Sequence, residues 1–255
     1  STADKFVLSA GDISAGADLN IVKVANTYMN GMGVEATSDG NHEYDANPPE
    51  LAQAKQNAKF KSLGMNLNIP KGNPLEHIIE ESFVTEKNGH KYAIIGLAPP
   101  DLHERIRDND SRKQIGVEDF ETTVKKVQEQ VNEYKKQGIN KIILLSHCGL
   151  AKDQRIARET DGIDIIIGGH THDLIKDIEV GKNLIYSKSN EPVIITQAGK
   201  DGEYFGNLKV SFDAEKGIIT KAQNNVSPSN QFKRNRVMKG VFDQILGKPE
   251  LLGEI

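Results

Sequence analysis

The fold is decided by the stretch IDIIIGGHTHD, residues 163–173. Its first five residues are almost entirely apolar, which predicts a short strand buried on both faces of a sheet. Two glycines follow and allow a sharp turn with close approach of the backbone. Two histidines then stand one residue apart, and neutral imidazole is the commonest protein ligand for ions such as Zn²⁺. A polar loop after a core strand would show the same pattern, so the rest of the chain must decide between the two interpretations.

The composition narrows the class of protein. With 255 residues the chain can hold one large domain, or one domain and the start of another. The formal net charge of −4 argues against a general nucleic-acid binder, which carries a basic face. No run approaches the roughly 20 apolar residues of a membrane span, and no signal peptide is visible. The single cysteine, Cys148, excludes an internal disulfide and fits a small buried residue better than a functional thiol.

Strands and helices alternate in the first two thirds of the chain. Apolar runs predict strands over residues 6–9, 34–38, 65–69, 83–85, 92–95, 141–145 and 163–167. Apolar residues at helical spacing, with capping residues before them, predict helices over residues 18–33, 47–64, 117–137 and 153–158. After His172 the helices vanish, and strands over residues 184–186, 193–197, 208–212 and 217–222 predict an antiparallel region. The fold class is therefore α/β or α+β, with two packed sheets.

Four polar loops, each following a predicted strand, carry the candidate chemistry. They contain Asp12, Asn41 with His42, His147, and His170 with His172. Such loops can converge on one edge of a sheet although they lie far apart in sequence. Carboxylate, amide oxygen and imidazole together suit Zn²⁺, Mn²⁺, Fe or Co²⁺. One carboxylate can bridge two ions about 3.5–4 Å apart, the arrangement used on phosphate esters. His42 and Asp45 have the spacing of a histidine whose tautomer is fixed by a carboxylate.

Each of these residues also has a structural interpretation when taken alone. Asp12 could be a turn residue or a helix cap, Asn41 a left-handed turn residue, and His147 a hydrogen-bonded core histidine. The joint pattern favours a metal site over these interpretations. The remaining histidines, which match no motif, are His77, His90 and His103. They are expected on the surface or in loops, and a position near the substrate is the alternative for His103.

Taken in order, the motifs resemble those of a known family. The segments GD at 11–12, GNHEYD at 40–45, SHCG at 146–149 and GHTH at 169–172 resemble the signature of the calcineurin-like metallophosphoesterases. Within it they resemble the 5′-nucleotidase family, which includes nucleotidases, UDP-sugar hydrolases and 2′,3′-cyclic nucleotide phosphodiesterases. QAG at 197–199 and GEYFG at 202–206 resemble that family's later strands. The resemblance covers nearly the whole chain and implies a two-sheet β core flanked by helices.

The resemblance also implies roles for the candidate residues. The implied metal ligands are Asp12, Asn41, His147, His170 and His172. Asp12 would bridge two divalent ions, and His172 would belong to the second ion only. His42, supported by Asp45, would contact the phosphate and the leaving group. The implied activity is hydrolysis of nucleotides or related phosphate esters by a metal-activated hydroxide, in a secreted, periplasmic or cell-surface protein.

Two departures from the family pattern affect these expectations. The family opens with a strand bearing an Asp-x-His pair that ligates the ion shared with His172, and no such pair precedes Asp12. We expect either that the start of the protein is missing or that the second site is incomplete. The chain as given would then hold about one ion tightly and hydrolyse phosphate esters poorly, if at all. A non-catalytic metal-binding or scaffold module is the alternative, which the His42–Asp45 pair disfavours. Asp39 also stands where the family commonly has an apolar residue.

The resemblance predicts the domain organisation as well. Residues 1–223 are expected to form the metallophosphoesterase catalytic domain. Residues 224–255 are expected to form a polar linker and the start of a following C-terminal domain that binds the substrate. The chain contains no tryptophan and only 5% aromatic residues, so the choice of nucleotide is not visible in it.

Overall fold

Two sheets form the centre of the computed structural model, which describes residues 3–14, 18–106 and 113–231. The four-stranded sheet is parallel and has the order β1 (Leu8–Ser9), β2 (Ala36–Ser38), β3 (Lys61–Leu63) and β5 (Ile79–Glu80). The six-stranded sheet has the order β11 (Leu184–Tyr186), β12 (Pro192–Thr196), β10 (Ile165–Gly168), β9 (Ile142–Ser146), β7 (His90–Leu97) and β6 (Ser82–Lys87). Its four middle strands are parallel, and the two edge strands are antiparallel to their neighbours.

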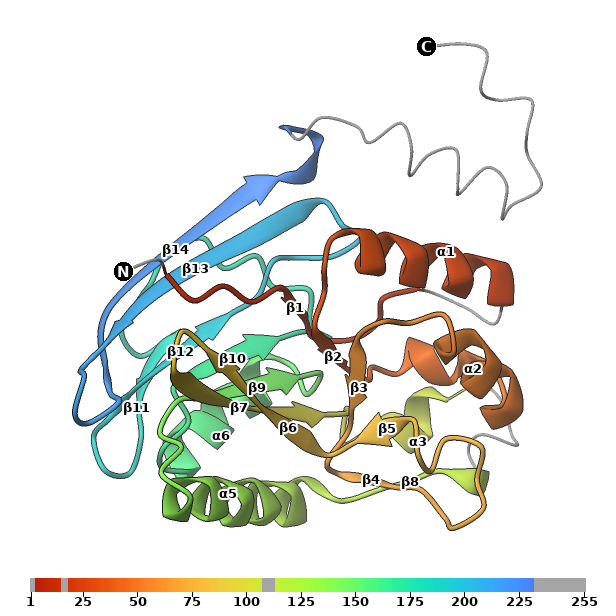
Figure 1. The fold of residues 1–255 in the computed structure, drawn as a ribbon, viewed down its shortest axis with the longest axis horizontal. Coiled ribbons are helices and arrows are strands. Elements are labelled where there is room, and N and C mark those ends of the chain that lie inside the picture. The colour runs from red at the N-terminus through yellow and green to blue at the C-terminus, as the bar shows by residue number, and fades with distance from the viewer. Residues whose placement is uncertain (1–2, 15–17, 107–112, 232–255) are drawn as a thin grey trace.

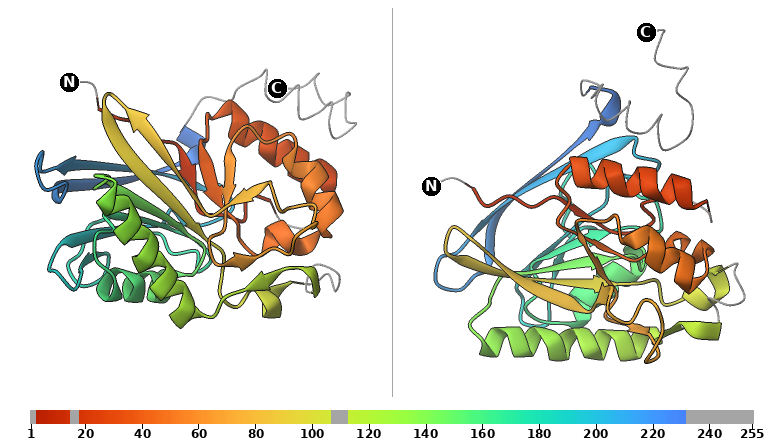
Figure 2. Two further views of the ribbon diagram at one scale, coloured as in Figure 1. Left: turned by 60° about the horizontal axis from the view of Figure 1, so that its bottom comes forward. Right: turned by 45° about the vertical axis from the view of Figure 1, so that its right-hand side comes forward.

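Helices cover the outer sides of the two sheets, as Figures 1 and 2 show for α1 and α5 on opposite sides of the molecule. The helices are α1 (Leu19–Gly31), α2 (Pro48–Lys55), α3 (Leu102–Arg105), α5 (Phe120–Lys136) and α6 (Leu150–Glu159), with short 3₁₀ turns η1 (His42–Asp45) and η2 (Ser229–Gln231). The side chains of Asp18, Asn47 and Asp119 accept hydrogen bonds from the first turns of α1, α2 and α5. These are the N-terminal caps that orphan backbone amides require. None of the described helices is long and apolar enough to cross a membrane.

The six-stranded sheet is buried on both faces, which explains the unbroken apolar runs of its central strands. One face packs against α5 and α6 through residues such as Val127, Val131 and Ile156. The other face packs against the four-stranded sheet, where Ile94 and Leu145 lie in the same cluster as residues of β2 and β3. Two small ladders complete the fold: β4 (Leu67–Asn68) with β8 (Gly116–Val117), and the long hairpin of β13 (Tyr204–Phe212) and β14 (Ile219–Pro228).

The mixed α/β architecture with two packed sheets is confirmed, and three local predictions are corrected. The helix expected over residues 47–64 ends at Lys55, because β3 begins at Lys61 and pairs in parallel with β2. Two of the three residues of β3, Lys61 and Ser62, are polar, so the apolar pattern of a strand is absent there. The strand expected over 65–69 shrinks to the two residues of β4. Finally, β12 runs parallel to β10, so the region after His172 is only partly antiparallel.

The expected linker starting at residue 224 is wrong for its first five residues. Strand β14 continues to Pro228, and Asn224 itself is buried and donates to the carbonyl of Ile175. The polar residues of this strand reflect a hairpin that is solvated on one side. Residues 232–255, which include most of the expected linker and the start of the following domain, lie outside the described residues.

Candidate active site

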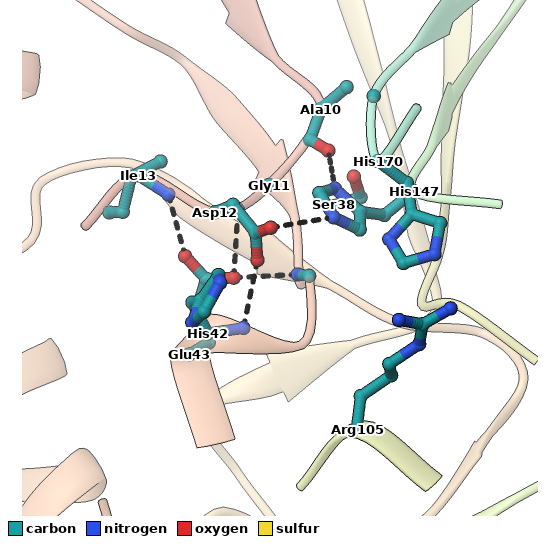
Figure 3. Close-up of polar contacts among 12 residues, drawn as sticks. Ala10, Gly11, Asp12, Ile13, Ser38, His42, Glu43, Arg105, His147 and His170 are labelled. Carbon is teal, nitrogen blue, oxygen red and sulfur yellow. Dashed lines mark hydrogen bonds and ion pairs between the residues drawn. The ribbon is translucent and has the colours of Figure 1, made fainter. Parts of the chain in front are cut away.

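The predicted polar loops meet at one edge of the two sheets. Asp12 follows β1 and His42 follows β2 in one sheet, while His147 follows β9 and His170 follows β10 in the other. Because these strands are parallel within each sheet, their carboxyl ends open to the same side. Figure 3 shows the four side chains around a common space.

Asp12 and His147 form the centre of this site. His147 Nε2 lies 2.9 Å from Asp12 Oδ2, yet within the described part of the chain this buried nitrogen has no hydrogen-bond partner of acceptable geometry. The other ring nitrogen, Nδ1, contacts the carbonyl of Ala10 and must donate its proton there. The lone pair of Nε2 then faces a carboxylate oxygen. Two acceptors at this distance require a proton or a cation between them.

Without a cation the two groups titrate as an ion pair. Burial opposes ionisation of both groups, but each stabilises the charged form of the other. The pKa of His147 is therefore raised and that of Asp12 is lowered from their ordinary values.

His170 lies next to this pair. Its ring centroid is 5.1 Å from that of His147, and its Nε2 is 3.7 Å from Oδ1 of Asp101. That carboxylate oxygen is buried and has no hydrogen-bond partner among the described residues. Burial, followed by the charge on His147, lowers the pKa of His170. The neutral imidazole that results is the form in which histidine binds a metal ion.

The donor set fits a divalent cation. Asp12 and His147 present a carboxylate oxygen and an imidazole nitrogen to the same point, with His170 beside them. The described residues contain no group of three or more histidine, cysteine or acidic side chains already placed to hold an ion. Asn41 stands directly before η1, and His172 is exposed. The assignment of these two residues, and of Asp12, His147 and His170, as metal ligands therefore stays a prediction.

Backbone conformation singles out the same loops. Asp12, His170 and His172 have φ angles of 52°, 75° and 60°, the left-handed region that residues other than glycine rarely occupy. They are three of the six described non-glycine residues with positive φ. Each such conformation costs on the order of 1–3 kcal/mol and persists where the surrounding structure enforces it, often at functional sites.

His42 and Asp45 form the expected pair within η1. His42 Nδ1 lies 2.7 Å from Asp45 Oδ2, and the histidine side chain is 34% exposed whereas the aspartate is 6% exposed. The backbone N–H of His42 donates to Asp12 Oδ1 at 2.8 Å, which links this pair to the candidate cation site. Asp45 fixes the ring so that Nε2 faces away from it, toward solvent.

Two glycines allow the loops to approach closely. A Cβ atom on Gly40 would lie 2.2 Å from Asp12 Oδ1. A Cβ atom on Gly169 would lie 2.7 Å from the carbonyl oxygen of Ala10 and 2.9 Å from His147 Nδ1, the two atoms that hydrogen-bond to each other. Glycine at these positions is a steric requirement of the site.

Glu43 is a site residue that sequence reasoning missed. Its buried carboxylate accepts hydrogen bonds from the backbone N–H groups of Asp12, Ile13 and Gly40 at 2.9, 2.8 and 2.6 Å. It therefore joins the loop after β1 to the loop after β2. Burial, with the nearby carboxylates of Asp12 and Asp39, raises the pKa of Glu43 to about 7. Glu43 lies inside the 40–45 motif, but nothing in the local pattern reveals that it is buried.

Asp101 and Arg105 were also missed, because the segment after residue 99 has no strong periodic pattern. Arg105 Nε lies 3.1 Å from Asp101 Oδ2, on the side of the carboxylate opposite the contact with His170. Figure 3 shows Arg105 extending toward the rings of His147 and His170. The site therefore has a positive group facing the candidate cation position.

The other histidines and the cysteine lie outside the site. His103 Nε2 hydrogen-bonds to the carbonyl of Ile115, His90 pairs with Asp4, and the side chain of His77 is 90% exposed. Cys148 is buried, and burial raises the pKa of its thiol far above the ordinary value. It is the small buried residue that the sequence predicts.

Comparisons with known proteins agree on one family. The profile of the calcineurin-like phosphoesterases matches residues 2–174. The chain is 32% identical to the trifunctional nucleotide phosphoesterase protein YfkN of Bacillus subtilis, over 89% of this chain and 17% of that protein. It is 30% identical to a probable 5′-nucleotidase of Treponema pallidum, over 85% of this chain and 38% of that protein.

The fold is similar to solved structures as well. The crystal structure of a 5′-nucleotidase precursor from Thermus thermophilus superposes with a TM-score of 0.81 at 25% identity, covering 95% of this chain and 50% of that one. The chain thus spans half or less of the length of these relatives. The match of the profile over most of the chain shows that it belongs to the calcineurin-like phosphoesterase family.

Proposed function

We propose that this chain carries the catalytic centre of a metal-dependent hydrolase that acts on phosphate esters of nucleotides. The observation that carries the proposal is the position of the His42–Asp45 pair beside the Asp12–His147 pair. One pair suits proton transfer, and the other suits a cation. A scaffold that only binds metal has no need of the first pair.

The residues that would hold the metal are Asp12, Asn41, His147, His170 and His172, of which Asp12 and His172 would contribute to a second ion. Zn²⁺, Mn²⁺, Fe or Co²⁺ suits this mixture of oxygen and nitrogen donors. When bound, such ions supply a nucleophile from water near neutral pH and neutralise charge on the phosphoryl oxygens. The contact between His147 Nδ1 and the carbonyl of Ala10 supports this assignment, because it leaves Nε2 free to bind.

His42 is proposed to protonate the leaving oxygen. Asp45 accepts the proton of Nδ1 and stabilises the positively charged ring, so that the proton on Nε2 faces the substrate. The His42 side chain is partly exposed and can therefore reach a bound ester. The hydrogen bond from the His42 backbone N–H to Asp12 keeps the histidine close to the proposed phosphate position. Arg105, held by Asp101 through Nε, is proposed to contact a phosphoryl oxygen through its other guanidinium nitrogens.

The names of the relatives support nucleotides as the substrate class. Recognition of the base is assigned to a further domain, because the matched relatives are longer than this chain. A secreted, periplasmic or cell-surface location is part of the same proposal.

The experiment is a hydrolysis assay with the purified chain, supplied in turn with Mn²⁺, Zn²⁺ and Co²⁺. Adenosine 5′-monophosphate, 2′,3′-cyclic AMP, UDP-glucose and bis(p-nitrophenyl) phosphate represent the ester classes. Because the ligands of the second ion are incomplete, we expect slow but detectable phosphate-ester hydrolysis that EDTA abolishes and that Asp12→Asn reduces to background. Absence of hydrolysis with every metal and ester, in a folded chain that binds metal, would contradict the proposal.

A further inference from the structure

Beneath the active-site loop lies a buried polar cluster that the proposed chemistry does not use. It consists of Asp39, Tyr44, Lys55 and Ser62, and we name it the Asp39–Lys55 anchor. Asp39 Oδ1 lies 2.9 Å from Lys55 Nζ, and Asp39 Oδ2 accepts the Tyr44 hydroxyl at 2.8 Å. Lys55 Nζ also donates to Ser62 Oγ at 2.7 Å. The side chains of Asp39 and Lys55 are 0% and 6% exposed.

The anchor connects four elements at the base of the site. Asp39 directly follows β2, Tyr44 lies inside η1, Lys55 is the last residue of α2, and Ser62 lies in β3. The η1 turn that Tyr44 belongs to also carries His42 and Asp45. The anchor therefore acts on the same short segment whose side chains face the substrate position.

The burial of both Asp39 oxygens excludes a role as a cation ligand and indicates a positioning role. Neither oxygen can reach a cation, since each already has a partner inside the protein. A buried ion pair also adds little stability, because desolvation of the two charges offsets most of their attraction and well-packed apolar residues often serve as well. The ion pair and its hydrogen bonds instead restrict geometry. The Tyr44 hydroxyl and the Lys55 ammonium can both donate to Asp39 only when the three side chains are correctly oriented.

We propose that Asp39 and Lys55 are positioning residues that fix η1, and with it the His42–Asp45 pair, relative to the cation site. The role assigned to His42 rests on the proposed function, whereas the fixing of η1 does not. Asp39 holds η1 through Tyr44, and Lys55 supplies the charge that keeps Asp39 in place. Glu43, which also belongs to η1, provides a second connection, because it accepts hydrogen bonds from the backbone N–H groups of Asp12 and Gly40.

The test replaces both charges at once, because either single change leaves an unpaired buried charge. In the full chain, Asp39→Leu/Lys55→Met should remain folded, with a lower thermal midpoint because the buried Tyr44 hydroxyl loses its acceptor. Hydrogen exchange of the backbone amides of residues 40–45 should accelerate at least tenfold. Tyr44→Phe, which removes one hydroxyl, should produce a smaller acceleration in the same segment. Thr123→Val, which removes a buried hydroxyl in α5, is the matched control and should leave residues 40–45 unchanged.

Kinetics supply the second readout. A nucleoside leaving group needs a proton from His42, whereas p-nitrophenolate leaves well without one. The double variant should therefore lose about tenfold more kcat on adenosine 5′-monophosphate than on p-nitrophenyl phosphate, with KM changed less than kcat. A purely structural role would lower both rates equally.

The outcomes separate the two proposals. Wild-type exchange in residues 40–45 of both the double variant and Tyr44→Phe would overturn the anchor. Equal loss on the two esters together with accelerated exchange would count against the role of His42 in the proposed function. If the double variant does not fold, hydrogen exchange of residues 40–45 in Tyr44→Phe alone tests the anchor. Failure of the wild type to hydrolyse any ester would count against the proposed function, while the exchange experiment would still test the anchor.

Discussion

Replacement of Gly169 by alanine tests how closely the two sheets must approach for the site to form. The new Cβ atom would lie 2.7 Å from the carbonyl oxygen of Ala10 and 2.9 Å from His147 Nδ1. Neither neighbour can move freely, because one is backbone and the other is a buried ring held by that same carbonyl. The methyl group must therefore push the loop after β1 away from His147.

The expected change in the free energy of unfolding is the sum of three contributions. Forcing an extra methyl group into a well-packed region costs about 1–3 kcal/mol. Loss of the hydrogen bond between His147 and Ala10 adds about 1 kcal/mol. Because Gly169 does not have the positive φ that penalises alanine, the reduced freedom of the unfolded chain returns about 0.4–1 kcal/mol. Gly169→Ala should therefore destabilise the fold by roughly 1–4 kcal/mol, with a metal affinity at least tenfold lower.

Gly206→Ala is the matched control for this substitution. Gly206 also lacks a positive φ, and a Cβ atom there would meet only Ala198 Cβ at 3.6 Å, an ordinary contact. Urea unfolding and calorimetric metal titration of both variants provide the comparison. Wild-type stability and metal affinity in Gly169→Ala would refute the steric argument for the site.

Three further predictions follow from other contacts. Burial raises the pKa of Asp164 to about 8, above its unfolded value of 3.8, so the folded state retains the proton and stability is lost as pH rises between these values. Asp164→Asn keeps an acceptor for the Ile142 N–H and should flatten the fall of the urea midpoint between pH 5 and pH 8; an unchanged slope would contradict this. His42→Ala should lower turnover by about 10²–10⁴ while bound metal, measured by elemental analysis, stays the same; parallel loss of metal would make His42 a ligand. Arg105→Met should weaken the binding of inorganic phosphate to the metal-loaded chain about tenfold in calorimetry, consistent with loss of one charged hydrogen bond, and equal affinity would remove Arg105 from the site.

The strand ends of the site could be predicted because strongly apolar runs precede them. The strands before His147 and His170 lie in a sheet buried on both faces, so their sequences carry an unambiguous signal. The pairing of His42 with Asp45 was also visible, since both residues belong to one short turn. These are features that local sequence encodes directly.

Long-range contacts account for what the sequence could not reveal. Glu43 binds amides on a loop some thirty residues away, and Asp101 faces His170 from a different part of the chain. The polar strand β3 is held by its pairing with β2 and not by its own propensity. Asp39 was visible as an unusual residue, but only the fold brings Lys55 next to it. In each case the contact depends on a partner residue that is distant in sequence, and the sequence alone does not identify that partner.

The most direct test of the metal site is calorimetric titration of the chain with Mn²⁺ and Zn²⁺, alongside Asp12→Asn, His147→Ala and the control His103→Ala. His103 hydrogen-bonds to a backbone carbonyl away from the site, so its loss should leave metal affinity unchanged. We expect saturable binding by the wild type and by the control, with affinity at least 100-fold lower in the two site variants. Equal binding by all four proteins, or no binding by the wild type, would contradict the assignment of the Asp12–His147 pair as the centre of a metal site.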